Sequence, residues 1–340
     1  MNDNKTEAIS KQAQSYYNQT PVIILGSGAS AAYGMSGMWD LSQHLIKTIE
    51  VEDLSQAEVE SWTEFCDLLK GTVGLESALQ KVNLSQVLTN KVVESTWALL
   101  VTQDIAAFEK SLIDLSLFPL GTLLKHMLGS TTKEINIITP NYDRLAEYAC
   151  EQEKIHHYSG FSPGYRGSPV RKDYLTCSRQ VNIWKVHGSL GWFVNEHGVN
   201  SSLSNIHRIP KGLTPLIVTP GIKKYANTHR EPYKTTIHEA DDVIDVASSY
   251  LCIGFGFNDV HIQEKLVNRC ATDDASIIVI TQKLSDSAKE FLFSGNSLRY
   301  LAIEAQENDL NSVVHSSEFD GPVEFDGNYW SLKGFLQLIM

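Results

Sequence analysis

Two turns rich in glycine each follow a short apolar run, an arrangement that can bring the backbone close to a phosphate. The first turn reads Gly-Ser-Gly-Ala-Ser at residues 26–30, after the apolar residues 22–25. The second reads Gly-Phe-Gly-Phe-Asn-Asp at residues 254–259, after residues 250–253. Glycine permits close approach to a ligand, and the N–H groups at the start of a helix attract anions. A tight strand-to-helix turn also needs glycine for geometry alone, so both interpretations stay open.

Three polar side chains come directly after two further apolar runs. Asn141 and Asp143 follow residues 135–139, and His187 stands beside Gly188 after residues 182–186. Open α/β sheets bind ligands at the carboxyl ends of their strands, where these side chains could face one crevice. An imidazole in that place can transfer a proton near neutral pH. The alternative is structural, with Asn141 capping the next helix and Asp143 complementing its dipole.

Four runs rich in β-branched residues predict the strands that position these side chains. They are mostly apolar on both faces, which is typical of buried parallel strands. Helical patterns follow three of them and indicate right-handed crossovers. The sequence therefore predicts an α/β fold with a Rossmann-like, doubly wound parallel sheet. The strands are expected at residues 22–25, 135–139, 250–254 and 276–280, and the helices at residues 40–50, 143–152 and 260–270.

The rest of the chain shows no boundary between domains. We expect one domain over residues 1–340, because no repeat or flexible linker divides it. Residues 52–128 predict a helical insertion, and residues 156–216 a loop-rich segment near the site that contains the strand-like run at 182–186. Apolar residues at helical spacing near the C-terminus predict an amphipathic helix. We expect it to pack on its own domain, with a subunit contact as the alternative. Its apolar residues are Leu332, Phe335, Leu336 and Ile339.

Composition excludes several functional classes. Of the 340 residues, 42% are hydrophobic and 20% charged, which is typical of a globular protein. The formal net charge of −12 disfavours direct binding to nucleic acid. No run approaches the roughly 18 apolar residues of a membrane span, and the polar N-terminus favours a cytoplasmic protein. The five cysteines are scattered, so we expect buried thiols and no metal site.

The order of these motifs resembles the sirtuin family over about residues 21–283. In that family the first loop reads Gly-Ala-Gly-x-Ser, the second motif Thr-Gln-Asn-x-Asp and the third His-Gly. Here they stand as residues 26–30, as Thr139-Pro140-Asn141-Tyr142-Asp143 and as His187-Gly188. The four-cysteine zinc module of the deacylases has no counterpart. Residues 34–39, Gly-Met-Ser-Gly-Met-Trp, replace their Gly-Ile-Pro-Asp-Phe-Arg, and proline replaces their glutamine. The sequences of these motifs are most similar to those of bacterial sirtuin-like domains in anti-phage defence systems.

That resemblance implies an NAD hydrolase (NADase) that cleaves the nicotinamide glycosidic bond and depletes NAD during anti-phage defence. NAD is then the substrate, and no metal is expected. Asn141 would position water and ribose, His187 would act as general base, and Asp143 would orient its neighbours. The residues expected to bind the dinucleotide are Gly26, Ser27, Gly28, Ala29, Ser30, Thr139, Gly254, Phe255, Gly256, Thr281 and Gln282.

The resemblance also implies partners and leaves alternatives. Related chains of this size pair with a HerA-type hexameric ATPase, so we expect a homo-oligomer that docks on such a partner. One alternative is a sensor or assembly subunit that binds NAD or ADP-ribose without turnover. A second is an NAD-dependent protein deacylase, which the missing zinc module disfavours. A dehydrogenase is least favoured, because no acidic residue stands convincingly about 20 residues after the glycine loop.

Overall fold

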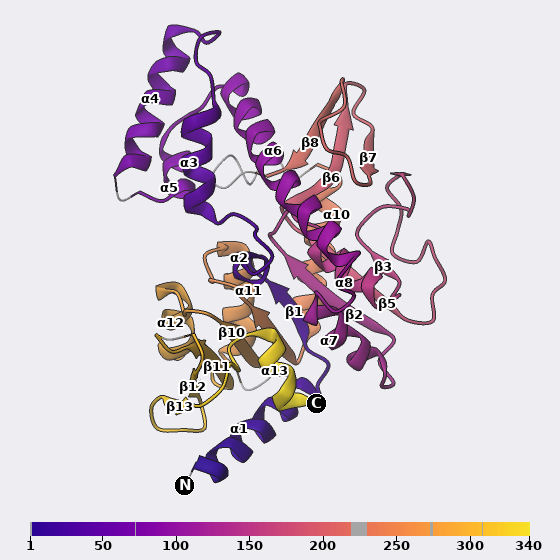
Figure 1. The fold of residues 1–340 in the computed structure, drawn as a ribbon, viewed down its shortest axis with the longest axis vertical. Helices are drawn as coiled ribbons and strands as arrows, with labels where there is room; N and C mark the ends of the chain where they lie inside the picture. The colour runs from indigo at the N-terminus through magenta and orange to yellow at the C-terminus, as the bar shows by residue number, and fades with distance from the viewer. Residues whose placement is uncertain (1, 72, 219–229, 273–274, 308) are drawn as a thin grey trace.

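A nine-stranded sheet forms the centre of the protein, in the order β13-β12-β11-β10-β9-β1-β2-β5-β3 (Figure 1). The computed structural model describes residues 2–71, 73–218, 230–272, 275–307 and 309–340. Neighbouring strands are parallel from β11 across to β3, and antiparallel between β11, β12 and β13. The strands are β1 (Val22–Leu25), β2 (Glu134–Thr139), β3 (His157–Tyr158), β5 (Gln180–Lys185), β9 (Ser249–Ile253), β10 (Ser276–Thr281), β11 (Tyr300–Ala305), β12 (Ser312–Ser316) and β13 (Val323–Phe325).

Helices cover both faces of this sheet, which explains why its central strands are apolar throughout. On one face lie α1 (Asn2–Tyr17), α7 (Pro119–Leu128), α8 (Leu145–Gln152) and α13 (Leu332–Ile339). On the other lie α10 (Tyr233–Val246), α11 (Val260–Cys270) and α12 (Asp286–Phe293). The prediction of an α/β fold with a doubly wound, mainly parallel sheet is confirmed.

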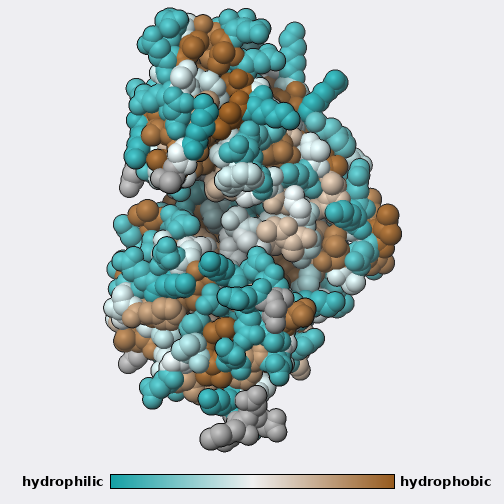
Figure 2. Space-filling view, turned by 60° about the vertical axis from the view of Figure 1, so that its left-hand side comes forward, coloured by the Kyte–Doolittle hydropathy of each residue, from teal (hydrophilic) through white to brown (hydrophobic). Residues whose placement is uncertain are grey.

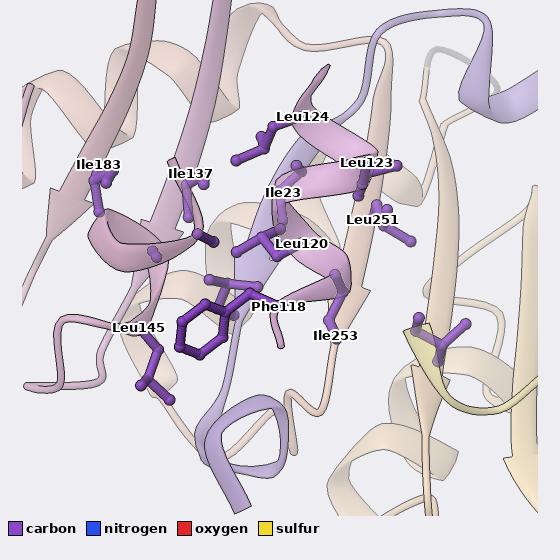
Figure 3. Packing of buried hydrophobic residues seen from close by; sticks show 14 of the residues in the cluster. Ile23, Phe118, Leu120, Leu123, Leu124, Ile137, Leu145, Ile183, Leu251 and Ile253 are labelled. Carbon is purple, nitrogen blue, oxygen red and sulfur yellow. The ribbon is translucent and has the colours of Figure 1, made fainter. Parts of the chain in front are cut away.

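Alternate residues of each strand enter the two cores. Ile23 and Leu251 pack on the α7 face, whereas Ile24 and Cys252 pack on the α11 face. Figure 3 shows Leu120, Leu123 and Leu124 of α7 lying over the strand residues Ile23, Ile137 and Leu251. Each of these leucines is at most 8% exposed, and full burial of such a side chain contributes about 1.5–3 kcal/mol. This packing fixes the carboxyl edge of the sheet, where the predicted site residues lie.

A separate helical lobe stands above the sheet in Figure 1. It contains α3 (Met38–Thr48), α4 (Gln56–Lys70), α5 (Leu75–Lys81) and the first part of α6 (Gln86–Ser111), around a core of their own. The helix predicted at residues 40–50 was interpreted as a crossover on the sheet, and this is wrong. Its apolar residues Leu41 and Leu45 instead join the lobe core with Trp62 and Phe65. The region predicted as a helical insertion thus forms much of the lobe, while α7 packs on the sheet.

A second, antiparallel sheet has the order β4-β7-β6-β8. Its strands are β4 (Arg166–Gly167), β6 (Gly188–Asn195), β7 (Asn200–Leu203) and β8 (Leu213–Ile217). The prediction of a loop-rich segment at residues 156–216 missed this sheet. The reason is local, because β4 (Arg-Gly) and β7 (Asn-Ser-Ser-Leu) show no apolar alternation. β6 begins directly after His187, so the small sheet holds that residue at the edge of the large one.

The amphipathic C-terminal helix packs within its own chain. Phe335, Leu336 and Ile339 of α13 are buried, and α13 contacts α1 and α7. The interpretation as an intradomain helix is confirmed. Cys66, Cys150, Cys252 and Cys270 are buried free thiols, and Cys177 is half-buried. Within the described ranges, no helix combines the length and the apolar character needed to cross a membrane.

Candidate functional site

The two glycine-rich turns are packed directly against each other. β1 leads through Gly26 into the short helix α2 (Ser27–Ala31), and β9 leads into Gly254. A Cβ atom on Gly26 would lie 2.3 Å from the carbonyl oxygen of Gly254, and one on Gly254 would lie 2.2 Å from the amide nitrogen of Ala29. Gly254 also has φ of +56°, in the left-handed region that favours glycine. These glycines are therefore needed for close contact between two turns.

Several N–H groups of the turns are already used. The N–H of Gly26 donates to the Ile253 carbonyl oxygen at 3.0 Å, and that of Gly28 donates to the Gly254 oxygen at 3.0 Å. The N–H groups of Ala29 and Gly254 likewise donate to backbone oxygens, at 3.0 and 2.9 Å. The N–H groups of these four residues are therefore already bonded to backbone oxygens. These residues can still form part of the surface that a ligand contacts, but hydrogen bonds within and between the turns already use their N–H groups.

Asn141 points from the end of β2 toward α2. Its Nδ2 donates to the Gly26 carbonyl oxygen at 2.8 Å and to Ser30 Oγ at 3.1 Å. Its own N–H donates to Thr139 Oγ1, which in turn donates to the carbonyl oxygen of Leu25. Helix α8 begins later, with Arg144 as its N-cap residue. The alternative interpretation of Asn141 as a helix cap is therefore wrong.

Asp143 lies buried beside α2. Its Oδ2 accepts a hydrogen bond from Ser30 Oγ at 2.7 Å, and its Oδ1 accepts one from the Leu145 N–H at 3.3 Å. Burial raises the pKa of the Asp143 carboxyl, against the opposing effects of Lys185 and of the Ser30 hydroxyl. Its contact with the Leu145 N–H gives Asp143 the helix-supporting role that was predicted as the structural alternative. Its contact with Ser30 also fixes α2 against β2.

Lys185 is a buried cation at the site that the sequence interpretation did not use. It ends β5 and is fully buried. Its Nζ donates to the carbonyl oxygen of Asp143 and lies 3.4 Å from Glu147 Oε1. The available signal was a lysine within the apolar residues Ile-Trp-Lys-Val at 183–186, two residues before His187. A charge in such a run requires a partner inside the fold.

His187 is paired with Asp259. Their Nε2 and Oδ2 atoms are 3.0 Å apart, and the His187 side chain is 18% exposed. Asp259 is also the N-cap of α11, where its Oδ1 accepts a hydrogen bond from the Ile262 N–H at 3.1 Å. The backbone of His187 is held by the Val218 N–H, which donates to its carbonyl oxygen at 2.8 Å. Nothing in the local sequence links His187 with Asp259, because the two residues lie far apart in the chain.

Two neighbouring cavities collect the predicted site residues. The Lys185 cavity has a volume of about 640 Å³, and the His187 cavity one of about 210 Å³. The first is lined by Gly28, Ala29, Ser30, Thr139, Asn141, Asp143, Lys185, Gly254, Thr281 and Gln282, among others. The second is lined by Gly26, Ser27, Ser30, Asn141, Asp143, His187, Phe255, Gly256 and Asp259, among others. Ser30, Asn141 and Asp143 form a wall of both.

The lobe closes the His187 cavity from above. Met35, Met38 and Leu41 line it together with Glu76 of α5. Figure 2 shows a pale, weakly polar hollow between the lobe at the top and the body below. The segment that departs from the deacylase motif, residues 34–39, therefore supplies part of this wall. In the part of the chain that the structure describes, no group of three or more His, Cys, Asp or Glu side chains is placed to hold a metal ion.

Part of the chain matches a known family. Residues 135–301 match the family model of the SIR2-like domain. The SIR2-like match begins in β2 and ends in β11, so it contains Asn141, Asp143, His187 and Asp259. The first glycine turn precedes it. No curated protein sequence matches the chain.

Several solved structures resemble the chain at low identity. A Sir2 homologue in complex with NAD shares 16% identity, with a TM-score of 0.41 over 78% of this chain and 79% of the other. A structure described as a basis for the mechanism and regulation of Sir2 enzymes shares 12%, with a TM-score of 0.42 over 84% and 89%. A mutant Sir2 homologue with ADP-ribose shares 15%, with a TM-score of 0.41 over 78% and 82%. The fold of the chain is established by its own strand order.

Thr281 and Gln282 line the Lys185 cavity where β10 ends, and neither lines the His187 cavity. The Gln282 side-chain amide donates to both carboxylate oxygens of Asp309 at 3.2 Å. Thr281 Oγ1 donates to the Lys283 carbonyl oxygen at 3.4 Å. Both side chains therefore line the cavity while already holding local partners. A ligand contact with either would compete with these bonds.

Proposed function

We propose that this chain is an NAD hydrolase that cleaves the nicotinamide glycosidic bond and yields nicotinamide and ADP-ribose. The observation that carries the proposal is the His187–Asp259 pair facing Asn141 across one cavity. A histidine held by a carboxylate is a suitable general base, and the amide of Asn141 can orient a hydroxyl or a water. The SIR2-like match over these residues supports NAD as the substrate.

We place the dinucleotide across both cavities. The nicotinamide ribose belongs in the His187 cavity, because the candidate base lies there. The ADP portion belongs in the larger Lys185 cavity, which Thr281 and Gln282 help to line. The shared wall of Ser30, Asn141 and Asp143 would then lie beside the bond that breaks.

The proposed reaction breaks the bond between ribose C1′ and the nicotinamide nitrogen. The bonding electron pair leaves with nicotinamide, which becomes neutral, and C1′ becomes oxocarbenium-like. Water positioned by Asn141 attacks C1′, and His187 Nδ1 accepts its proton, while Asp259, which faces Nε2 of the same ring, stabilises the resulting imidazolium. A positioned general base contributes about 10²- to 10⁴-fold in rate. The lobe above the cavity would exclude bulk water from the reacting centre.

The sequence resemblance supports a wider role. We propose that the 340 residues act as one cytoplasmic NAD-binding unit that depletes NAD in anti-phage defence. We further propose that it forms a homo-oligomer and is controlled by a HerA-type hexameric ATPase, with no direct contact to nucleic acid. Light scattering should show an oligomer that grows when the ATPase is added. A monomer under both conditions would contradict the assembly part of the proposal.

A product-resolved NAD turnover assay, with and without the candidate ATPase, tests the reaction. Asn141→Ala and His187→Ala should each reduce formation of nicotinamide and ADP-ribose by about 10²- to 10⁴-fold. His197→Ala is the matched control, because that histidine is exposed and lies in neither cavity. It should leave turnover unchanged. Full activity of the Asn141→Ala/His187→Ala double variant would refute the assignment.

One observation favours a second candidate function. The His187 cavity, at about 210 Å³, is smaller than the roughly 300–1,000 Å³ of ordinary small-molecule sites. A subunit that only binds ADP-ribose or NAD in the Lys185 cavity, without turnover, would not need a larger His187 cavity. Calorimetry that shows NAD binding, together with no product under any partner condition, would favour this sensor function. Turnover of acylated peptides would instead favour a deacylase.

A further inference from the structure

A third cavity, of about 680 Å³, lies between α8, β3 and the small antiparallel sheet. We call it the Glu147 cavity, after the α8 residue in its wall. Among the described residues, none that lines it also lines the Lys185 or the His187 cavity. Its size falls within the roughly 300–1,000 Å³ range of small-molecule sites. The proposed NAD reaction makes no use of it.

Two buried polar atoms of this cavity have unused hydrogen-bonding capacity. Glu147 is 8% exposed, and its Oε1 lies 3.4 Å from Lys185 Nζ. Within the described part of the chain, neither Glu147 Oε2 nor His157 Nδ1 has a hydrogen-bond partner, although both atoms are buried. A buried polar group without a partner costs about 1–3 kcal/mol, so such groups commonly mark a site for a ligand or water. The carboxylate oxygen requires a hydrogen-bond donor, such as an amino group.

Aromatic side chains form another part of the wall. Tyr158, Phe161 and Trp192 line the cavity and are buried. The rings of Phe161 and Trp192 lie 5.3 Å apart, centroid to centroid, so they form one apolar surface. Aromatic walls of this kind bind flat rings by stacking and by edge contacts. A planar group with N–H donors would satisfy both the wall and Glu147.

The mouth of the cavity carries cations. Lys154 and Lys172 are exposed lining residues, and His156 beside them is exposed as well. Lys172 also pairs with Glu239 at 3.2 Å, and Glu151 lies near His157 at 3.6 Å. Two lysines at one opening can still attract an anion with more than one charge, as a phosphate chain has. The cavity thus combines a buried acceptor, aromatic walls and two exposed lysines.

We propose that the Glu147 cavity is a second nucleotide site, separate from the proposed NAD site. The amino-bearing base would donate to Glu147 Oε2 and lie against Phe161 and Trp192. The phosphates would lie at Lys154 and Lys172. A nucleotide fits this arrangement, because it has a ring with N–H donors at one end and a multiply charged phosphate chain at the other.

Calorimetric titration of the full chain with ADP tests this site, because ADP has no nicotinamide to release. The wild type should show two binding events. Lys154→Glu/Lys172→Glu should weaken one event at least about tenfold and leave the other unchanged. The matched control is Lys283→Glu/Lys333→Glu, because these two lysines line the Lys185 cavity. This control variant should weaken the binding event that Lys154→Glu/Lys172→Glu leaves unchanged.

Glu147→Gln then tests how the base is recognised. It should weaken ADP at the second site about tenfold and leave inorganic pyrophosphate unaffected, since pyrophosphate has no base. A single event that the Lys154/Lys172 reversal removes would support this site and count against ADP binding at the proposed NAD site. A titration unaffected by the Lys154/Lys172 reversal would overturn the second site, as would one event that depends only on Lys283 and Lys333.

Discussion

Asp259 makes two contacts that belong to different parts of the molecule. One carboxylate oxygen caps α11 through the Ile262 N–H, and the other faces His187 Nε2 at 3.0 Å. A residue with both roles ties the position of the imidazole to the start of a helix. In the proposed reaction Asp259 is a positioning residue, because it acts on the substrate through His187.

Replacing Asp259 with asparagine should separate these two roles. The variant keeps an oxygen for the Ile262 N–H, so the cap remains, but it loses the charge that stabilises a protonated His187. We expect NAD turnover to fall about 10- to 1,000-fold with KM nearly unchanged, as measured in steady-state kinetics.

Two further variants control for helix stability and for coupling. Ser55→Ala disturbs the capping box of α4 in the lobe, and it should cost about 1 kcal/mol of stability with turnover intact. Asp259→Asn should add little in a His187→Ala background, because both act through the same imidazole. Full additivity of the two losses would contradict the positioning role.

The chemistry-bearing residues could be predicted only where a strand end identified them. Asn141, Asp143 and His187 follow apolar runs, and the structure places all three around one cavity. The pairing of His187 with Asp259 and the burial of Lys185 depend on contacts between distant segments. Neither leaves a pattern in the local sequence.

At the scale of elements, the decisive feature is the contact between the α2 turn and the turn after β9. Gly26 donates its N–H to Ile253 at the end of β9, Gly28 donates its N–H to Gly254 of the second turn, and Gly254 leaves no space for a side chain. This contact makes the floor of both cavities a single rigid unit. Small changes in either turn are thus transmitted to the other.

Gly254→Ala should break this contact. Its Cβ would lie 2.2 Å from the Ala29 amide nitrogen, and φ of +56° adds backbone strain of about 1 kcal/mol or more. We expect a loss of at least about 2 kcal/mol in unfolding free energy, measured by urea denaturation, and loss of NAD binding. The matched control is Gly256→Ala, where the nearest atom is the Asn258 side-chain nitrogen at 3.2 Å. Equal stability of the two variants would show that the turns are not tightly packed.

Strands and helices with a clear apolar pattern could be predicted from the sequence, whereas polar strands could not. The strands at residues 22–25 and 276–280 and the helix at residues 260–270 match β1, β10 and α11 closely. The polar strands β4 and β7 were missed, because β4 pairs with β7 and β7 with β6 through backbone hydrogen bonds, and neither strand has an apolar face. The helix at residues 40–50 was predicted correctly, but the core that it packs into was not. An amphipathic pattern shows that a helix has an apolar face and does not show which core that face joins.

At the scale of the whole molecule, the lobe and the sheet have separate cores. Phe65 and Trp62 belong to the lobe core, whereas Phe335 belongs to the core beneath α13. The two parts meet at the His187 cavity, where Met38 and Glu76 face the edge of the sheet. We therefore expect the lobe to open and unfold without the sheet.

Phe65→Ala should test this separation. Removing a fully buried phenylalanine costs about 3–5 kcal/mol, and the loss should fall on the lobe. Hydrogen exchange should show faster exchange in α4 and α5, with β1 and β9 still protected. Phe335→Ala is the matched control and should instead deprotect α1 and α13. Faster exchange throughout the molecule in both variants would indicate one cooperative unit.

The central place of β1 in the sheet has a consequence for how the protein is made. Val22 pairs with Tyr250, a residue that the ribosome adds much later. At about 5–20 residues per second, one edge of this apolar strand waits on the order of tens of seconds for its neighbour. An unpaired edge can recruit other nascent chains during that interval. We therefore expect the yield of folded protein to depend on translation, before the carboxyl edge of the sheet is complete.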